Sequence, residues 1–140
     1  MFKVPLTALA FLALGTASAN AATYTGTVQV AITVQVKSSV PAGQKFICGV
    51  SINVYDPSAG GQGPYTGASV EKTASGGVLK CEVDIPYSWA IGTDMASVSA
   101  SWSVSEGTME TGASRNIRNG LTGFTPTKNG TTRLTVTGTM

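Results

Sequence analysis

The stretch TVQVAITVQV, from Thr27 to Val36, decides how this sequence is read. It belongs to a longer segment, 24–36, in which the even positions are apolar apart from Gly26 and the odd positions are polar or small. Successive side chains of a β-strand point to opposite faces, so an alternation of period two predicts a strand with one buried face. A strand this long and regular needs a partner for its hydrogen-bonding edge and another for its apolar face.

Residues 1–21 have the pattern of a secretory signal peptide. Lys3 precedes an apolar run at 4–15, and small residues follow at alternate positions. The run is shorter than the roughly 20 residues that a membrane-spanning helix needs, so it predicts a leader that is removed. We expect cleavage before Asn20 or Ala22, and we expect a secreted, periplasmic or extracellular domain at 22–140 with no membrane span in the mature chain.

The composition of residues 22–140 predicts an all-β domain. Valine and threonine dominate, whereas leucine is limited to Leu79, Leu121 and Leu134. Side chains with a branched β-carbon favour the extended backbone, and leucine favours the helix. The whole chain has nine basic and seven acidic residues, with no block of like charge. This balance predicts no nucleic-acid partner.

Further alternating segments are separated by turn signals. The clearest are 45–55, 78–85 and 97–105, and Pro86 is expected to start another strand. Asn129 and Gly130 predict a tight hairpin between the last two strands. About seven or eight strands without an amphipathic helix predict a single-domain antiparallel β-sandwich, with a small barrel as the alternative.

The two cysteines, Cys48 and Cys81, fall on the apolar faces of their expected strands. In an exported chain two cysteines predict one disulfide, here buried and joining two strands. A redox or metal pair would need a CxxC spacing or histidine, and the sequence has neither.

The sequence offers little for catalysis. Without histidine there is no Ser–His or Cys–His dyad and no ordinary zinc site. Glu82 and Asp84 alternate with apolar residues and are expected on a solvent face. Asp56 and Asp94 lack the spacing of a dedicated calcium loop. We therefore expect no catalytic, cofactor-binding or metal-binding residues, and a protein that is not an enzyme.

Aromatic side chains suggest a possible binding surface. The segment 56–69 is rich in glycine and proline, so we expect a mobile loop with Tyr65 exposed. Tyr55, Tyr87 and Trp89 could join Tyr65 in a platform for sugar rings. The alternation at Tyr87 and Trp89 instead favours core positions. A close basic pair, Arg115 and Arg118, is expected in a solvated loop.

The segment 24–36 could pair within its own sheet or enter a groove of a neighbouring subunit, where backbone hydrogen bonds give affinity. Together with the two cysteines it resembles the N-terminal donor strand of chaperone–usher pilin subunits, which are exported, disulfide-containing β-sandwiches. The resemblance implies polymerisation by strand addition. The C-terminus departs from it, because 131–140 has no near-terminal aromatic residue. We expect 24–36 to be the domain's own first strand.

These patterns predict an exported, non-enzymatic structural or interaction domain at the cell surface or in the periplasm. Two alternatives remain open. One is a pilin-like subunit that polymerises through 24–36, with a second copy as partner. The other is a carbohydrate- or protein-binding module that uses the 56–69 loop.

Overall fold

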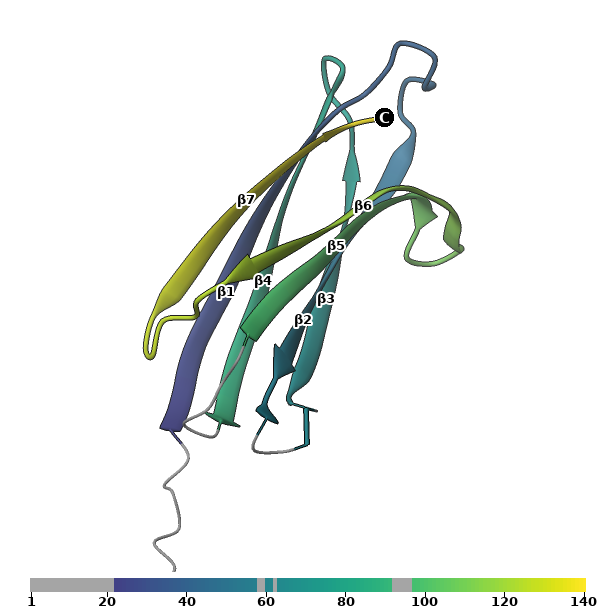
Figure 1. The fold of residues 1–140 in the computed structure, drawn as a ribbon. Helices are drawn as coiled ribbons and strands as arrows, with labels where there is room; N and C mark the ends of the chain where they lie inside the picture. The colour runs from purple at the N-terminus through teal and green to yellow at the C-terminus, as the bar shows by residue number, and fades with distance from the viewer. Residues whose placement is uncertain (1–21, 58–59, 62, 92–96) are drawn as a thin grey trace, which may run out of the picture.

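The computed structural model describes residues 22–57, 60–61, 63–91 and 97–140, with the side chains of 115–117 left out. The predicted leader, 1–21, and Asp94 lie outside the described residues. Seven strands form the fold (Figure 1): β1 (Ala22–Gln35), β2 (Lys45–Tyr55), β3 (Tyr65–Thr73), β4 (Val78–Ile91), β5 (Ser97–Thr108), β6 (Gly112–Phe124) and β7 (Thr131–Thr139). Within these ranges the chain forms no helix that is long and apolar enough to span a membrane.

The strands form two sheets, ordered β4-β1-β7 and β3-β2-β5-β6. After β1 the chain builds the β2–β3 hairpin in the second sheet and returns as β4 beside β1. It then builds the β5–β6 hairpin in the second sheet and returns as β7 on the other side of β1 (Figure 1). The predicted all-β sandwich is confirmed.

Strand β1 lies in the centre of its sheet and uses both edges. Its odd-numbered amides face β7, as the bond from Thr27 N to Gly130 O (3.0 Å) shows. Its even-numbered amides face β4, as the bond from Val36 N to Gly77 O (2.8 Å) shows. The strand is antiparallel to β4 and parallel to β7. The expectation that 24–36 is the domain's own first strand is confirmed.

The core lies between the two sheets and follows the alternation of the sequence. Each of β1, β2, β4 and β5 turns its apolar positions inward, and β7 adds Val136. The buried residues of these four strands are Val28, Val30, Ile32, Val34, Phe46, Cys48, Val50, Ile52, Val54, Leu79, Cys81, Val83, Ile85, Tyr87, Trp89, Ile91, Val98, Ala100, Trp102 and Val104.

The disulfide links the two sheets through this core. Cys48 lies on β2 and Cys81 on β4, with their Cα atoms 6.4 Å apart, and both residues are buried. The predicted pairing is confirmed. The bond therefore ties the two layers together, near the start of both β2 and β4.

Pro86 does not start a strand, as the sequence suggested, but lies inside β4. It stands opposite Thr27 of β1, whose amide is directed to β7. This pair therefore has no hydrogen bonds between β1 and β4, and the missing N–H of Pro86 faces away from β1. Because β4 is an edge strand, no other strand needs that donor.

The predicted hairpin at Asn129 and Gly130 is wrong, because β6 and β7 belong to different sheets. The connection between them crosses the sandwich and docks on the other sheet. Tyr87 Oη of β4 donates to Thr127 O at 2.7 Å. The chain can come this close because Gly26 has no side chain; a Cβ there would collide with Gly130 O.

The expected 56–69 loop is shorter in the structure, because Tyr65 to Ser69 belong to β3. The strand pairs with β2 from Tyr65 opposite Asn53 onward. Its inward side chains Ala68 and Val70 are only partly buried against the core. Their small size and the outward Gly67 weaken the alternation that would mark the strand in the sequence.

Replacing both Cys48 and Cys81 with alanine should lower the free energy of unfolding by about 2–5 kcal/mol, as is usual for the native bridge of a small domain. Urea denaturation monitored by circular dichroism measures the loss. Thiol titration of denatured, unreduced wild type should find no reactive thiol. Two reactive thiols per chain would contradict the bridge.

Removing β1 should abolish folding. A chain of residues 37–140 loses Val28, Val30, Ile32 and Val34, and burial of each contributes on the order of 1.5–3 kcal/mol. That sum is comparable to the total stability of an ordinary domain, about 5–15 kcal/mol. Size-exclusion chromatography and circular dichroism should show unfolded or aggregated 37–140 and a folded, monomeric 22–140. A folded 37–140 that binds a 23–36 peptide would contradict this expectation.

Candidate functional site

The outward face of the four-stranded sheet carries small side chains aligned across all four strands. Two neighbouring rows follow from the register between β3, β2, β5 and β6. The first row is Ser69, Gly49, Ser103 and Asn119, and the second is Gly67, Ser51, Ser101 and Leu121.

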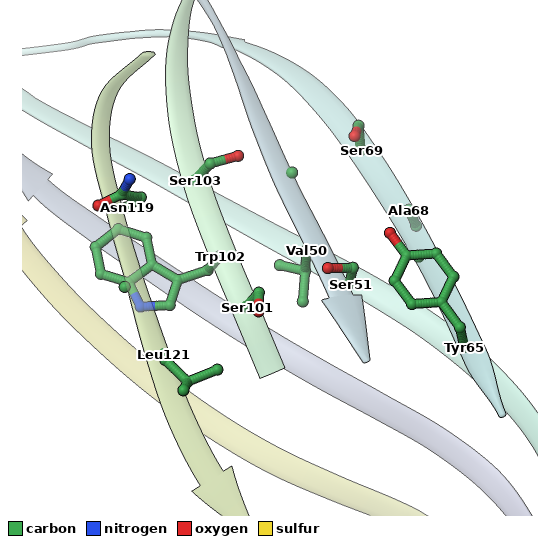
Figure 2. A pocket seen from close by; sticks show the side chains of 13 residues that line it. Val50, Ser51, Tyr65, Ala68, Ser69, Ser101, Trp102, Ser103, Asn119 and Leu121 are labelled. Carbon is green, nitrogen blue, oxygen red and sulfur yellow. The ribbon is translucent and has the colours of Figure 1, made fainter. Parts of the chain in front are cut away.

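These rows form an open trough with a volume of ≈ 860 Å³, here called the serine trough. Tyr65 and Leu121, 71% and 69% exposed, rise on opposite sides of it (Figure 2). The glycines and serines between them are too small to fill the space. The trough is thus a consequence of side-chain size on a continuous sheet.

Gly49 provides an open position between two hydroxyl groups. A Cβ at this residue would lie 3.2 Å from Ser69 Oγ and 3.2 Å from Ser103 Oγ. Both hydroxyls therefore border the space that a larger side chain would occupy. A ligand atom in that space could contact both oxygens.

The serine trough is polar but uncharged. No residue that lines it is acidic or basic. Within the part of the chain that the structure describes, no protein hydrogen bond engages the hydroxyls of Ser51, Ser69, Ser101 or Ser103, and no side-chain polar atom is buried without a partner. The four hydroxyls are therefore open to water, each with one donor and two acceptor lone pairs.

Beyond Ser69 on β3, an ion pair on the surface links Glu71 of this strand to Lys45 of β2. Lys45 Nζ lies 2.7 Å from Glu71 Oε1, and Met109 N donates to Glu71 Oε2 at 3.1 Å. The hydrogen bonds from Lys45 and Met109 stabilise the carboxylate and lower the pKa of Glu71. The nearest acidic side chain on β3 is therefore already paired.

A second depression, with a volume of ≈ 360 Å³, adjoins the serine trough and shares Tyr65 with it. Asn53, Ser97 and Ser99 supply polar groups, and Tyr55, 50% exposed, supplies a second aromatic ring. This surface is also free of charged side chains. The two depressions are therefore both neutral and meet at Tyr65.

The four aromatic residues considered from the sequence divide into two pairs. Tyr87 and Trp89 are buried and stack on each other with ring centroids 4.3 Å apart. Tyr55 and Tyr65 are exposed on the four-stranded sheet. The predicted exposure of Tyr65 is confirmed, although the residue begins a strand rather than lying in a loop.

Arg115 and Arg118 were expected in a loop, but both lie on strand β6. The guanidinium of Arg118 lies 5.8 Å from the centroid of the Trp102 ring, within the range of a cation–π contact. Its side chain also approaches Gly138 of β7, where a Cβ would be 2.9 Å from Arg118 Nε. Arg118 therefore covers the side of the core between β6 and β7, and the side chain of Arg115 lies outside the described residues.

The outward face of the three-stranded sheet differs in character. Glu82 and Asp84 are exposed there, as predicted. Gln29 Nε2 donates to Asp84 Oδ1 at 3.1 Å, and Arg133 Nε donates to Gln29 Oε1 at 3.0 Å. This row across β4, β1 and β7 satisfies its polar groups internally. The outward face of the three-stranded sheet therefore carries charged side chains, whereas the two depressions on the four-stranded sheet are lined by none.

Of the two acidic residues considered as calcium ligands, Asp94 lies outside the described residues. Asp56 is buried, and its backbone oxygen accepts a bond from Gly61 N at 2.9 Å. No group of three or more cysteine, aspartate or glutamate side chains that could hold a metal ion occurs in the described ranges.

Sequence reasoning missed the serine trough. Serine recurs at every odd position from 97 to 105, which marked one polar strand face. That signal does not reveal which strands lie beside β5. Only the register places Gly49 between Ser69 and Ser103.

Known proteins give no further guide to this site. No protein family, curated protein or solved structure matches the chain. The chemistry of the trough's own residues is therefore the basis for a function.

Two glycines of β6 give a matched test of the packing beside the trough. A Cβ at Gly120 would lie 2.6 Å from Trp102 Cε2, whereas a Cβ at Gly123 would meet nothing within 4 Å. Gly120→Ala should therefore lower the free energy of unfolding by about 1–3 kcal/mol through overpacking. Gly123→Ala should stay within about 0.5 kcal/mol of wild type. Equal urea midpoints for the two variants would contradict the placement of Trp102.

Proposed function

We propose that residues 22–140 form an exported, non-enzymatic interaction domain that binds its partner through the serine trough. The observation that carries this proposal is a concave, uncharged surface bordered by the exposed Tyr65 and Leu121. Exposed aromatic and apolar side chains around a polar depression are typical of binding surfaces. The disulfide and the leader-like sequence at 1–21 support export, because disulfides persist in oxidising compartments.

The position of the core on the opposite side of the sheet from the trough also supports a binding role. The core and the disulfide lie entirely on the inward side of the four-stranded sheet. The outward side chains of the trough are consequently available for a ligand. A rigid sheet holds such groups with more precision than a loop does.

Self-association at the cell surface is the second candidate function. Strand β7 is an edge strand with one charged residue, Arg133, and no proline. An edge strand with a single charge and no proline can pair with a strand of another copy. The pilin-like version through 24–36 would require β1 to leave β4 and β7, so assembly would more readily use the free edge of β7. Size-exclusion chromatography of 22–140 tests both versions of self-association, because a monomer at every concentration contradicts both.

A trough-filling substitution tests the proposed function. Fluorescently labelled 22–140 is applied to intact cells and extracellular material of the organism that makes it. Ser101→Arg places a long charged side chain over the trough and should weaken binding about tenfold or more, the loss expected for a central contact. The matched control is Ser75→Arg, in the turn before β4, which should bind like wild type.

Both variants should have a free energy of unfolding within about 0.5 kcal/mol of wild type in urea denaturation, since both sites are on the surface. Equal binding by Ser101→Arg and wild type would contradict the role of the trough. If wild-type 22–140 binds neither the intact cells nor the extracellular material, the proposed function itself is contradicted.

A further inference from the structure

We infer that the serine trough binds an uncharged carbohydrate, an oligosaccharide with free hydroxyl groups and no carboxylate, phosphate or sulfate. This inference rests on the proposed function and names the ligand class of the same site. It depends on three properties of the surface: the arrangement of its hydroxyl groups, its exposed aromatic rings and its lack of charge.

The hydroxyl groups suit a ligand that can both donate and accept. Ser69 Oγ and Ser103 Oγ border the open position over Gly49, and Ser51 and Ser101 occupy the next row. A sugar hydroxyl placed over Gly49 could donate to one serine oxygen and accept from the other. An apolar ligand would cover these hydroxyl groups without satisfying their hydrogen bonds, which is unfavourable.

The aromatic rings suit the apolar face of a sugar ring. Tyr65 is the most exposed of the large hydrophobic residues in the described chain, and it borders both depressions. Tyrosine combines a flat apolar ring with a polar hydroxyl, as required by a ligand whose faces are apolar and whose rim is polar. Tyr55 provides a second ring in the adjoining depression, so the surface can hold more than one sugar unit.

The lack of charge limits which carbohydrate can bind. Neither depression is lined by a charged side chain. The nearby Glu71 is paired with Lys45. An acidic glycan would lose hydration at the trough without gaining an opposite charge, which is unfavourable. A neutral glycan meets no such penalty.

A second copy of the chain fits this surface less well. Tyr65 and Leu121 rise beside the trough and would hold two opposed sheets apart. The serine hydroxyls would then be covered without regular partners. A neutral glycan avoids both problems, because it carries its own hydroxyls and does not need to bring a second sheet against the trough.

An NMR titration tests the inference. Isotope-labelled 22–140 is titrated separately with cello-, malto-, xylo-, manno- and N-acetylchito-oligosaccharides, and with oligogalacturonate as the charged counterpart. At least one neutral sugar should shift the backbone amides of Gly49, Ser51, Ser69 and Ser103. Oligogalacturonate should not shift them.

Two pairs of variants assign the binding to the trough. Tyr65→Ala removes the stacking ring, and Gly49→Ala fills the position between Ser69 and Ser103; each should raise the Kd about tenfold, which corresponds to about 1.4 kcal/mol. The controls are Met109→Ala, another exposed large side chain, and Gly123→Ala, which has open space around it. Both controls should bind like wild type.

Several outcomes would overturn the inference. These are shifts with oligogalacturonate alone, no shift with any neutral sugar, or equal affinities for all variants. Shifts at the trough that appear on raising the protein concentration without sugar would instead assign the face to a second copy. If Ser101→Arg abolishes cell binding while no neutral sugar binds, the proposed function stands and the carbohydrate assignment fails.

Discussion

The hydrogen bonds on the two edges of β1 are the constraint on which the rest of the structure depends. The strand pairs with β4 through one set of amides and with β7 through the other, so it alone holds the three-stranded sheet together. Its inward valines and isoleucine fill the core, and the disulfide from β4 then fixes this sheet to β2. The second sheet is supported from one side only, which leaves its outward face free for another role.

Strand β5 shows how stability and binding are divided within one segment. Its inward side chains, Val98, Ala100, Trp102 and Val104, are buried, whereas serines occupy the alternate outward positions. Burial of apolar area stabilises the fold, and small outward side chains add little to it. Small residues can therefore be placed next to one another on β2, β3 and β5 without loss of the core. The trough and the carbohydrate chemistry that we assign to it follow from this division.

The alternation of the sequence was sufficient to predict the strands with large apolar faces, the inward positions and the disulfide. The alternation failed to predict features that depend on contacts between residues far apart in the sequence, or on strands whose inward residues are small. Asn129 and Gly130 favour a turn, but the bond from Tyr87 to Thr127 directs the chain to the other sheet. Strand β3 has only small inward residues, so its start was read as a loop. The trough needs residues from four strands in register, and period two within one strand does not determine which strands are neighbours.

Hydrogen exchange at β1 in the monomer tests this account most directly. The account predicts that amides directed to β4, such as Val30 and Ile32, and amides directed to β7, such as Thr27 and Gln29, all exchange only on global unfolding. Concordant protection of both sets in monomeric 22–140 is the expected result. Protection of Val30 and Ile32 with rapid exchange at Thr27 and Gln29 would contradict it, because β1 would then have an open edge.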